Sequence, residues 1–249
     1  DLVDFLSDYI LGDAGPMAEN IADKYNISRE AQDEYAYRSQ MRANAAQEAG
    51  KFEDEIMPVK VEKRKESFVF DKDETVRSDV TIDKLGKLPT VFKKDGSVTP
   101  GNASSINDGA AAVVVMSEEK AEELGVTPLA TIKGWASAGV KPDEFGIGPV
   151  PSNKKVLKKT GLTLDDIELI ELNEAFASST IACINELNLD EDKVNVNGGA
   201  ISLGHPVGAT GIILTIKMIS EMKRRKSKHG LVTMCIGSGQ GISVVLENL

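Results

Sequence analysis

Three segments of the 249-residue sequence place a reactive or polar side chain beside glycines or at the end of an apolar run. The first, residues 195–211, reads NVNGGAISLGHPVGATG. An alternating Val-Asn-Val-Asn run, residues 194–197, predicts a strand before it, and an apolar-periodic run, residues 212–225, predicts a helix after it, so a glycine-rich loop is expected between them. Such a loop lets backbone approach a ligand, and the helix start behind it favours developing negative charge. His205, stiffened by Pro206, could donate a hydrogen bond to an oxyanion there. A tight loop with a solvated His205 is the alternative.

Asn173 follows DDIELIEL, a short apolar-rich run that predicts a strand. Proteins of the α/β class build their sites at the carboxyl ends of sheet strands, where the Asn173 amide would then lie. The alternative is a helix N-cap, because Asn is favoured there and Glu174 would suit the first turn.

Cys235 follows an apolar run and precedes three glycines, in the segment LVTMCIGSGQGISVVLENL. A dinucleotide-binding loop would have to open a helix, whereas here a second strand pattern follows. The segment therefore predicts two strands joined by glycines, which let backbone or a ligand approach the sulfur. A buried structural cysteine is the alternative.

Together the three segments resemble the thiolase superfamily, specifically its acetyl-CoA acetyltransferase and 3-ketoacyl-CoA thiolase group. The resemblance runs along the whole chain, and its ordered motifs are residues 15–40, 101–121, 173–176, 198–208 and 235–241. It implies an acyltransferase that condenses two acetyl-CoA to acetoacetyl-CoA or cleaves 3-ketoacyl-CoA with CoA.

In such an enzyme a proton α to a thioester is removed and the enolate must be stabilised as it forms. A thiolate can act as the base if nearby donors bring its pKa toward the working pH, and the resemblance assigns this acid/base role to Cys235. It assigns donation to the thioester oxygen to His205, and a water held in the same oxyanion site to Asn173. The backbone N–H of Gly237 matches one donor of a second oxyanion hole.

Four further positions match CoA contacts of the family. Ser104 matches a position near the pantetheine, and Ala175 and Phe176 match the wall of its channel. Arg77 matches a contact to the nucleotide end of CoA, with an ordinary exposed arginine as the alternative. The CoA thioester would be a substrate, so we expect no permanently bound cofactor and no metal.

The expected fold is α/β, a thiolase-like layered α-β-α arrangement with an α+β loop domain. Residues 1–99 would form the loop domain that covers CoA, residues 100–127 the tail of the N-terminal core half, and residues 128–249 the C-terminal core half. The run AAAVVVM, residues 110–116, predicts a buried strand, and IMPVKVE, residues 56–62, another. Ser28 and Ser117 are expected to cap helices that Gly50 and Gly125 end.

Thiolases of this group carry their acyl-accepting cysteine in an N-terminal half, which we expect to be absent here. The sequence holds two cysteines, and Cys183 falls at no catalytic position of the family, so it is expected in the core. The chain alone is therefore expected to be inactive. A non-catalytic CoA-binding or assembly fragment is the alternative. A ketoacyl synthase is less favoured, because it needs two site histidines and His229 lies in a basic helix end.

Some positions depart from the family pattern. The chain reads Asp13-Ala14-Gly15 where members acting on acetoacetyl-CoA often read His-Met-Gly, which could reshape the acyl pocket. Ser105 and Ser238 stand where glycine is common.

The composition narrows the class of protein. Its 41% apolar and 27% charged residues are ordinary for a globular protein, and the two distant cysteines argue against a disulfide framework. A formal charge of −10 disfavours nucleic acid, and the basic cluster at 223–229 suits a helix end. We expect a cytoplasmic protein without a membrane segment, forming a homodimer or homotetramer, or pairing with a complementary N-terminal chain.

Overall fold

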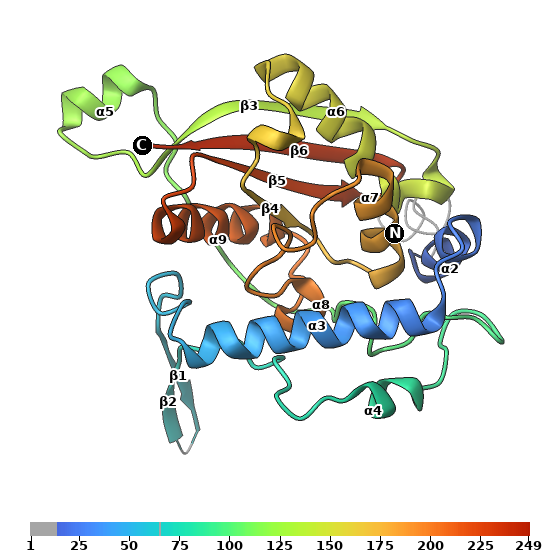
Figure 1. The fold of residues 1–249 in the computed structure, drawn as a ribbon. Helices are drawn as coiled ribbons and strands as arrows, with labels where there is room; N and C mark the ends of the chain where they lie inside the picture. Colours follow the sequence, from blue (N-terminus) through green and yellow to red (C-terminus); the bar gives the residue numbers. More distant parts are fainter. Residues whose placement is uncertain (1–13, 65) are drawn as a thin grey trace, which may run out of the picture.

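A four-stranded sheet forms the frame of the computed structural model, which describes residues 14–64 and 66–249 (Figure 1). In spatial order its strands are β3 (Ala130–Gly139), β6 (Gln240–Asn248), β5 (His229–Ile236) and β4 (Leu169–Leu172). β4 and β5 run parallel, whereas the β3–β6 and β6–β5 pairs are antiparallel. The expected closing hairpin is therefore confirmed as β5 and β6.

Helices cover both faces of this sheet. Neighbouring residues of β5 point to opposite sides: Leu231 belongs to the core beneath α6 (Pro149–Thr160) and α7 (Ala177–Leu187), and Val232 packs with α9 (Thr210–Arg225). Figure 1 shows α9 on one side of the sheet and α6 and α7 on the other. This arrangement confirms the predicted layered α-β-α fold.

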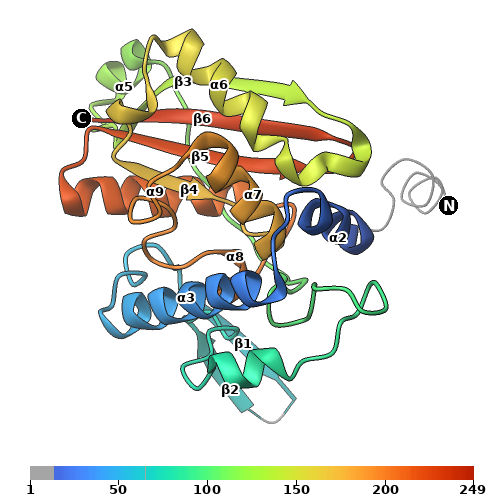
Figure 2. The same cartoon turned by 45° about the vertical axis from the view of Figure 1, so that its right-hand side comes forward.

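The N-terminal part packs against this layered unit through two helices, α2 (Ala14–Lys24) and α3 (Arg29–Glu48). Figure 2 shows both helices beside the layered unit. Ser28 caps α3 as predicted, accepting a hydrogen bond from the Ala31 N–H at 3.2 Å. Gly50 follows the helix with a φ of 68°. α3 lies against α7 and against α8 (Ala200–Leu203), a short helix within the glycine-rich loop.

The smaller elements are short. They are the paired strands β1 (Val59–Lys63) and β2 (Glu66–Phe70), the helices α4 (Ile82–Gly86) and α5 (Glu118–Leu124), and the 3-10 helices Pro142–Ile147 and Leu164–Asp166. β1 starts three residues later than the predicted strand 56–62. Ser117 and Gly125 bound α5 as expected.

Two predicted strands are wrong. Residues 110–116 pair with no strand in the described part of the chain, and Val114 and Val115 are 84% and 69% exposed. Their apolar composition predicts burial, but a segment can be buried as a strand only where a neighbouring strand offers its backbone for pairing. The Val-Asn-Val-Asn run contributes a single parallel bridge, between Val194 and Ile170.

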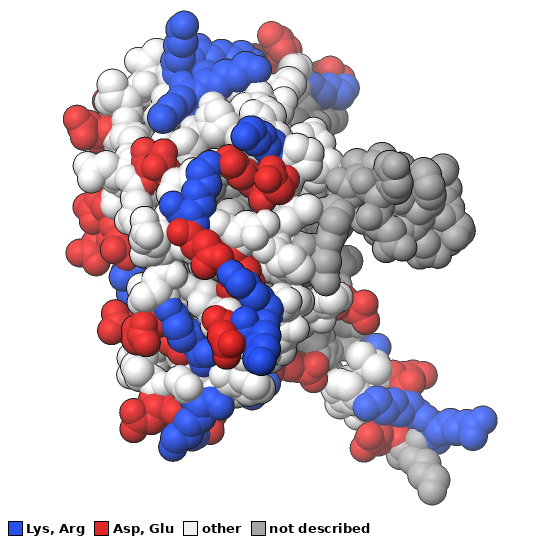
Figure 3. Space-filling view, turned by 90° about the vertical axis from the view of Figure 1, so that its right-hand side faces the viewer, with Lys and Arg blue, Asp and Glu red and all other residues white. Residues whose placement is uncertain are grey.

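The surface carries mixed charge. On the face seen in Figure 3, basic and acidic side chains are interleaved, apart from a basic group at the top, where α6 lies in Figure 1. The basic end of α9 is held in ion pairs, with Arg224 bound to Glu55 and Glu221, and Arg225 bound to Glu221. Within the described ranges, none of the helices has the length and apolar character needed to cross a membrane.

Candidate active site

The site forms at the edge of the sheet where the parallel strands β4 and β5 end. The backbone N–H of Asn173, the residue after β4, donates to the Thr233 carbonyl at 3.0 Å. Cys235 comes two residues later in β5. Asn173 and Cys235 therefore occupy the carboxyl ends of neighbouring parallel strands, where the sequence predicted a site.

His205 reaches the same place from the glycine-rich loop. Its Nε2 atom lies 3.3 Å from Nδ2 of Asn173, whose side chain is almost fully buried. The N-cap of α7 is Phe176, so the alternative of Asn173 as a helix cap is wrong.

Hydrogen bonds fix the His205 ring and its loop. Nδ1 lies 2.7 Å from the Thr210 hydroxyl, which donates to the Pro206 carbonyl at 2.9 Å. The His205 backbone N–H donates to Asn107 Oδ1 at 3.1 Å. A ring held in this way is not the solvated histidine of the alternative reading.

The contacts also assign the proton on His205. Burial lowers the pKa of His205, which favours the neutral imidazole. Because the Thr210 proton goes to Pro206, the hydroxyl oxygen accepts from Nδ1–H, and Nε2 accepts from Asn173 Nδ2. Donation from Nε2 to a thioester oxygen requires the other tautomer, in which the Thr210 hydroxyl turns to Nδ1.

A buried carboxylate that the sequence analysis treated only as a first-turn residue anchors the loop. Glu174 accepts from Tyr35 at 2.9 Å, Ser39 at 2.7 Å, Asn195 at 2.8 Å and the Ile201 N–H at 3.2 Å. It thus joins α3 to the loop. A Cβ at the adjacent Gly199 would collide with this carboxylate, which explains one of the loop glycines. The only sequence signal for this anchoring role was the position of an acidic residue directly after Asn173.

The surroundings of Cys235 set its acidity. Burial raises the pKa of the Cys235 thiol to about 11, and its own backbone N–H offsets this only in part. No cation among the described residues lowers this pKa, so the thiol form prevails in the chain as described. Cys183 is buried in α7 and its thiol donates to the Gly146 carbonyl at 3.4 Å, as expected of a core residue.

The glycines after Cys235 allow a close backbone approach. Cys235 is paired with Gly241 across the hairpin, and a Cβ on Gly241 would collide with the backbone of Gly148. Gly237 is exposed in the connecting turn, where Ser238 and Gly239 have φ values of 68° and 83°.

Three of the four predicted CoA-contact residues lie together beside Asn173. The N–H and the hydroxyl of Ser104 both donate to the Ala175 carbonyl, each at 3.0 Å. Phe176 forms a bridge with Ala103, and its ring meets Phe92 edge to face with centroids 6.2 Å apart. The structure does not bring Arg77 to this group. It is exposed, and its backbone N–H donates to Gln40 Oε1 at 2.9 Å.

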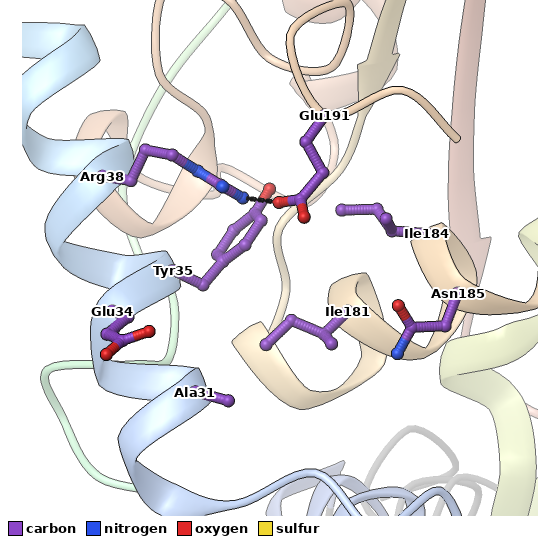
Figure 4. A pocket seen from close by; sticks show the side chains of 8 residues that line it. All are labelled: Ala31, Glu34, Tyr35, Arg38, Ile181, Ile184, Asn185 and Glu191. Carbon is purple, nitrogen blue, oxygen red and sulfur yellow. Dashed lines mark hydrogen bonds and ion pairs between the residues drawn. The ribbon is translucent and has the colours of Figure 1, made fainter. Parts of the chain in front are cut away.

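A cavity lies away from these residues, between side chains of α3 and α7. Its volume is about 190 Å³, and its wall includes Tyr35 and the Arg38–Glu191 ion pair (Figure 4). It contains none of the predicted site residues. In the described part of the chain, histidine, cysteine and carboxylate side chains form no group of three that could hold a metal ion.

Two features predicted from the sequence fall outside the described residues. They are Asp13, the first residue of the Asp13-Ala14-Gly15 departure from the family pattern, and the start of the predicted loop domain.

Two family models match nearly the whole chain. Residues 2–119 match the thiolase N-terminal domain and residues 126–248 the thiolase C-terminal domain. The acetyl-CoA acetyltransferase of Chromobacterium violaceum is 53% identical over 234 residues, which cover 94% of this chain and 60% of that protein. That of Escherichia coli is 52% identical over 235 residues, with the same coverage.

Solved structures give the same result. The crystal structure of the Bacillus anthracis acetyl-CoA acetyltransferase superposes with a TM-score of 0.93 at 49% identity, covering 95% of this chain and 60% of that one. Human mitochondrial 3-ketoacyl-CoA thiolase in complex with CoA gives 0.90 at 48% identity, covering 94% and 58%. The chain thus spans about three fifths of the length of the curated relatives it matches.

Proposed function

Because the chain belongs to the thiolase family, we propose that its site serves thiolase-type acyl transfer on CoA thioesters. The observation that carries this proposal is the contact between Asn173 and His205 at the end of the sheet where Cys235 is the last residue but one of β5. That edge holds an amide, an imidazole and a thiol, the groups needed to stabilise an enolate and to move its proton.

In the proposed condensation, Cys235 as thiolate takes a proton from the methyl group of acetyl-CoA, and the enolate carbon attacks the carbonyl of an acyl thioester. The acyl C–S bond then breaks, and the sulfur that carried the acyl group leaves as a thiolate. In cleavage, the Cys235 thiol returns the proton to the enolate of the departing acetyl-CoA. With a pKa of about 11 the thiol form prevails at neutral pH, which favours the proton-donating half. In the tautomer reached when the Thr210 hydroxyl turns to Nδ1, His205 Nε2–H, with a water on Asn173, would hold the enolate oxygen. The Gly237 N–H would hold the acyl oxygen.

The acyl group needs a second nucleophile. Cys183 is buried in α7 and bonded to a carbonyl, so it does not fit this role. We infer that a complementary N-terminal segment supplies the acyl-accepting cysteine, and that the full assembly is a homodimer or homotetramer.

The substrate side of the proposal rests on the wall beside Asn173. Ser104, Ala175 and Phe176 would line the pantetheine channel, with Arg77 contacting the nucleotide end. The CoA thioester acts as substrate, so no permanently bound cofactor is proposed. Two free cysteines suit a reducing compartment, and we place the protein in the cytoplasm.

The test joins this chain to the segment that its relatives carry in addition. The chain is fused behind the N-terminal two fifths of the Chromobacterium violaceum enzyme, and thiolysis of acetoacetyl-CoA by CoA is measured. We expect turnover in the fusion and in its Cys183→Ala control, and loss of turnover in Cys235→Ser, because a hydroxyl is too weak an acid for the proton step. No turnover in the fusion would favour the alternative, a non-catalytic CoA-binding or assembly role, and equal turnover with and without the Cys235 thiol would remove Cys235 from the proton step.

A further inference from the structure

A small cavity has the Asn173 side chain in its wall. Its volume is about 20 Å³, and its wall includes Asn173, Gly199, Thr210 and Lys217. One water molecule needs about 10–15 Å³ of such space and two or more polar partners. The cavity therefore has room for a single water molecule.

Asn173 offers the first partner. Its Nδ2 faces His205, while its Oδ1 is buried without a hydrogen-bond partner in the described part of the chain. The side chain itself is 4% exposed. A buried acceptor in this state is unfavourable unless something donates to it.

Lys217 offers the second. Its ammonium lies inside the protein, where it donates to Glu171 Oε2 at 2.9 Å and to the Gly198 carbonyl at 2.7 Å. Lysine has three donor hydrogens, so one is left after these two bonds. Glu171 is two residues before Asn173, so both side chains project from the same face of the strand, against which α9 packs (Figure 1).

We propose that one buried water occupies this cavity, accepts the remaining hydrogen of Lys217 and donates to Asn173 Oδ1. Lys217 is then a positioning residue, which acts through the water on the amide and through the amide on His205. The link holds the ring proton on Nδ1 in the substrate-free site, so donation from Nε2 to an enolate oxygen requires that this proton arrangement change when substrate binds. This meaning for acyl transfer rests on the function proposed above, but the existence of the link does not.

The consequence concerns which end of the amide meets the imidazole. With Oδ1 held by the water, Nδ2–H must face Nε2 of His205, and the ring proton stays on Nδ1 against Thr210. Without the water link, the amide can rotate and present Oδ1 to His205, which favours the proton on Nε2.

The test reads this proton without any substrate. The sequence has two histidines, so ¹⁵N NMR of the 249-residue chain shows two imidazole rings, and His229, bonded to the Asp166 carbonyl, is an internal reference. In the unaltered chain we expect widely separated Nδ1 and Nε2 shifts for His205. In Lys217→Met the two shifts should move together as the tautomers mix. Lys193→Met also removes an ammonium bound to a carbonyl, that of Ile167 at 3.0 Å, and should leave His205 unchanged.

A second variant covers the case in which a buried unpaired Glu171 prevents folding of Lys217→Met. Glu171→Gln/Lys217→Met removes both charges together and should give the same change in the His205 shifts. A magnetisation-transfer signal from a long-lived water to the Asn173 amide should appear in the unaltered chain and vanish in the variants. His205 shifts that stay the same in a folded variant, or no such water signal in the unaltered chain, would overturn the proposal. Neither readout depends on thiolase activity, so this proposal can be confirmed or overturned whether or not the fusion enzyme shows turnover.

Discussion

The Asn173 amide and the His205 imidazole meet at 3.3 Å although 32 residues separate them in the sequence. The strand end fixes Asn173, and the loop between α8 and α9 carries His205 back to it. Because a hydrogen bond to Thr210 fixes the His205 ring and the Asn173 side chain is almost fully buried, the pair presents a prearranged polar surface beside the Cys235 strand.

This arrangement predicts a loss of catalysis without a loss of helix stability. In the fusion enzyme, His205→Ala should lower kcat by about 10²–10³, the usual effect of removing one oxyanion donor. Asn173→Ala should lower kcat less, and it should leave α7 intact because Phe176 is the N-cap. Steady-state kinetics and thermal unfolding of the same preparations measure both. An Asn173→Ala enzyme with unchanged kcat and reduced stability would return Asn173 to a structural role.

The acidity of Cys235 predicts its reactivity. Since burial raises the pKa of this thiol to about 11, its alkylation rate by iodoacetamide should increase tenfold per pH unit up to pH 9.5 without a plateau. Mass spectrometry of a Cys183→Ala chain follows the single remaining thiol. A plateau between pH 7 and 9 would mean that donors lower this pKa after all.

Replacing the Glu174 carboxylate should lower the free energy of unfolding by a large amount. Replacing its carboxylate in Glu174→Gln weakens four hydrogen bonds from buried donors, and bonds to a charged group contribute about 1.5–3 kcal/mol each. We expect a loss of at least about 2 kcal/mol in the free energy of unfolding. Glu34→Gln, an exposed change on α3, should cost almost nothing. Denaturant unfolding with equal effects from the two substitutions would contradict the anchoring role.

Glu171 predicts how stability changes with pH. Burial raises the pKa of Glu171 to about 7 against an ordinary 4.5, with Lys217 opposing the rise. Between these values the folded state binds more protons than the unfolded state, so this carboxyl makes stability fall as pH rises from about 4.5 to about 7. In Glu171→Gln this part of the slope should be absent. Unfolding free energies at pH 5, 6 and 7 provide the comparison, and parallel curves for the two proteins would refute it.

The 249-residue chain on its own should not catalyse thiolysis, because one sulfur cannot both carry the acyl group and move the proton. Apolar side chains such as Val114, Trp135 and Ile132 are 84%, 55% and 48% exposed, so the chain should also self-associate. Enzyme assays and size-exclusion chromatography on material of verified mass test both. Turnover close to that of an ordinary thiolase would show that a second nucleophile is present.

Local signals in the sequence predicted local structure well. Ser28 and Ser117 cap the helices they were expected to cap, and the glycines after Cys235 join two strands. The meeting of Asn173 with His205 came from ordered motifs and a family resemblance, since neither side chain alone indicates its distant partner.

The failures share a physical cause, which is dependence on residues far away in the chain. Residues 110–116 look like a buried strand, yet burial requires a neighbouring strand that the segment itself cannot specify. The raised pKa of Cys235 depends on how distant parts of the chain bury the thiol in three dimensions. The Glu171–Lys217 pair joins a strand to a helix 46 residues on, and no spacing rule connects them.

The Glu174 network also limits how far this protein can be treated as separable modules. Tyr35 and Ser39 reach Glu174 from α3 across 139 and 135 residues of sequence, so the interior of the sheet unit is completed by hydroxyls from the N-terminal part. A chimera that takes residues 14–99 from another relative would inherit the loop geometry only if it kept both hydroxyls. Long-range closures of this kind slow folding, because the entropy of closing the intervening chain must be lost before the contacts form. The geometry of the proposed substrate site thus depends on hydrogen bonds between distant parts of the chain.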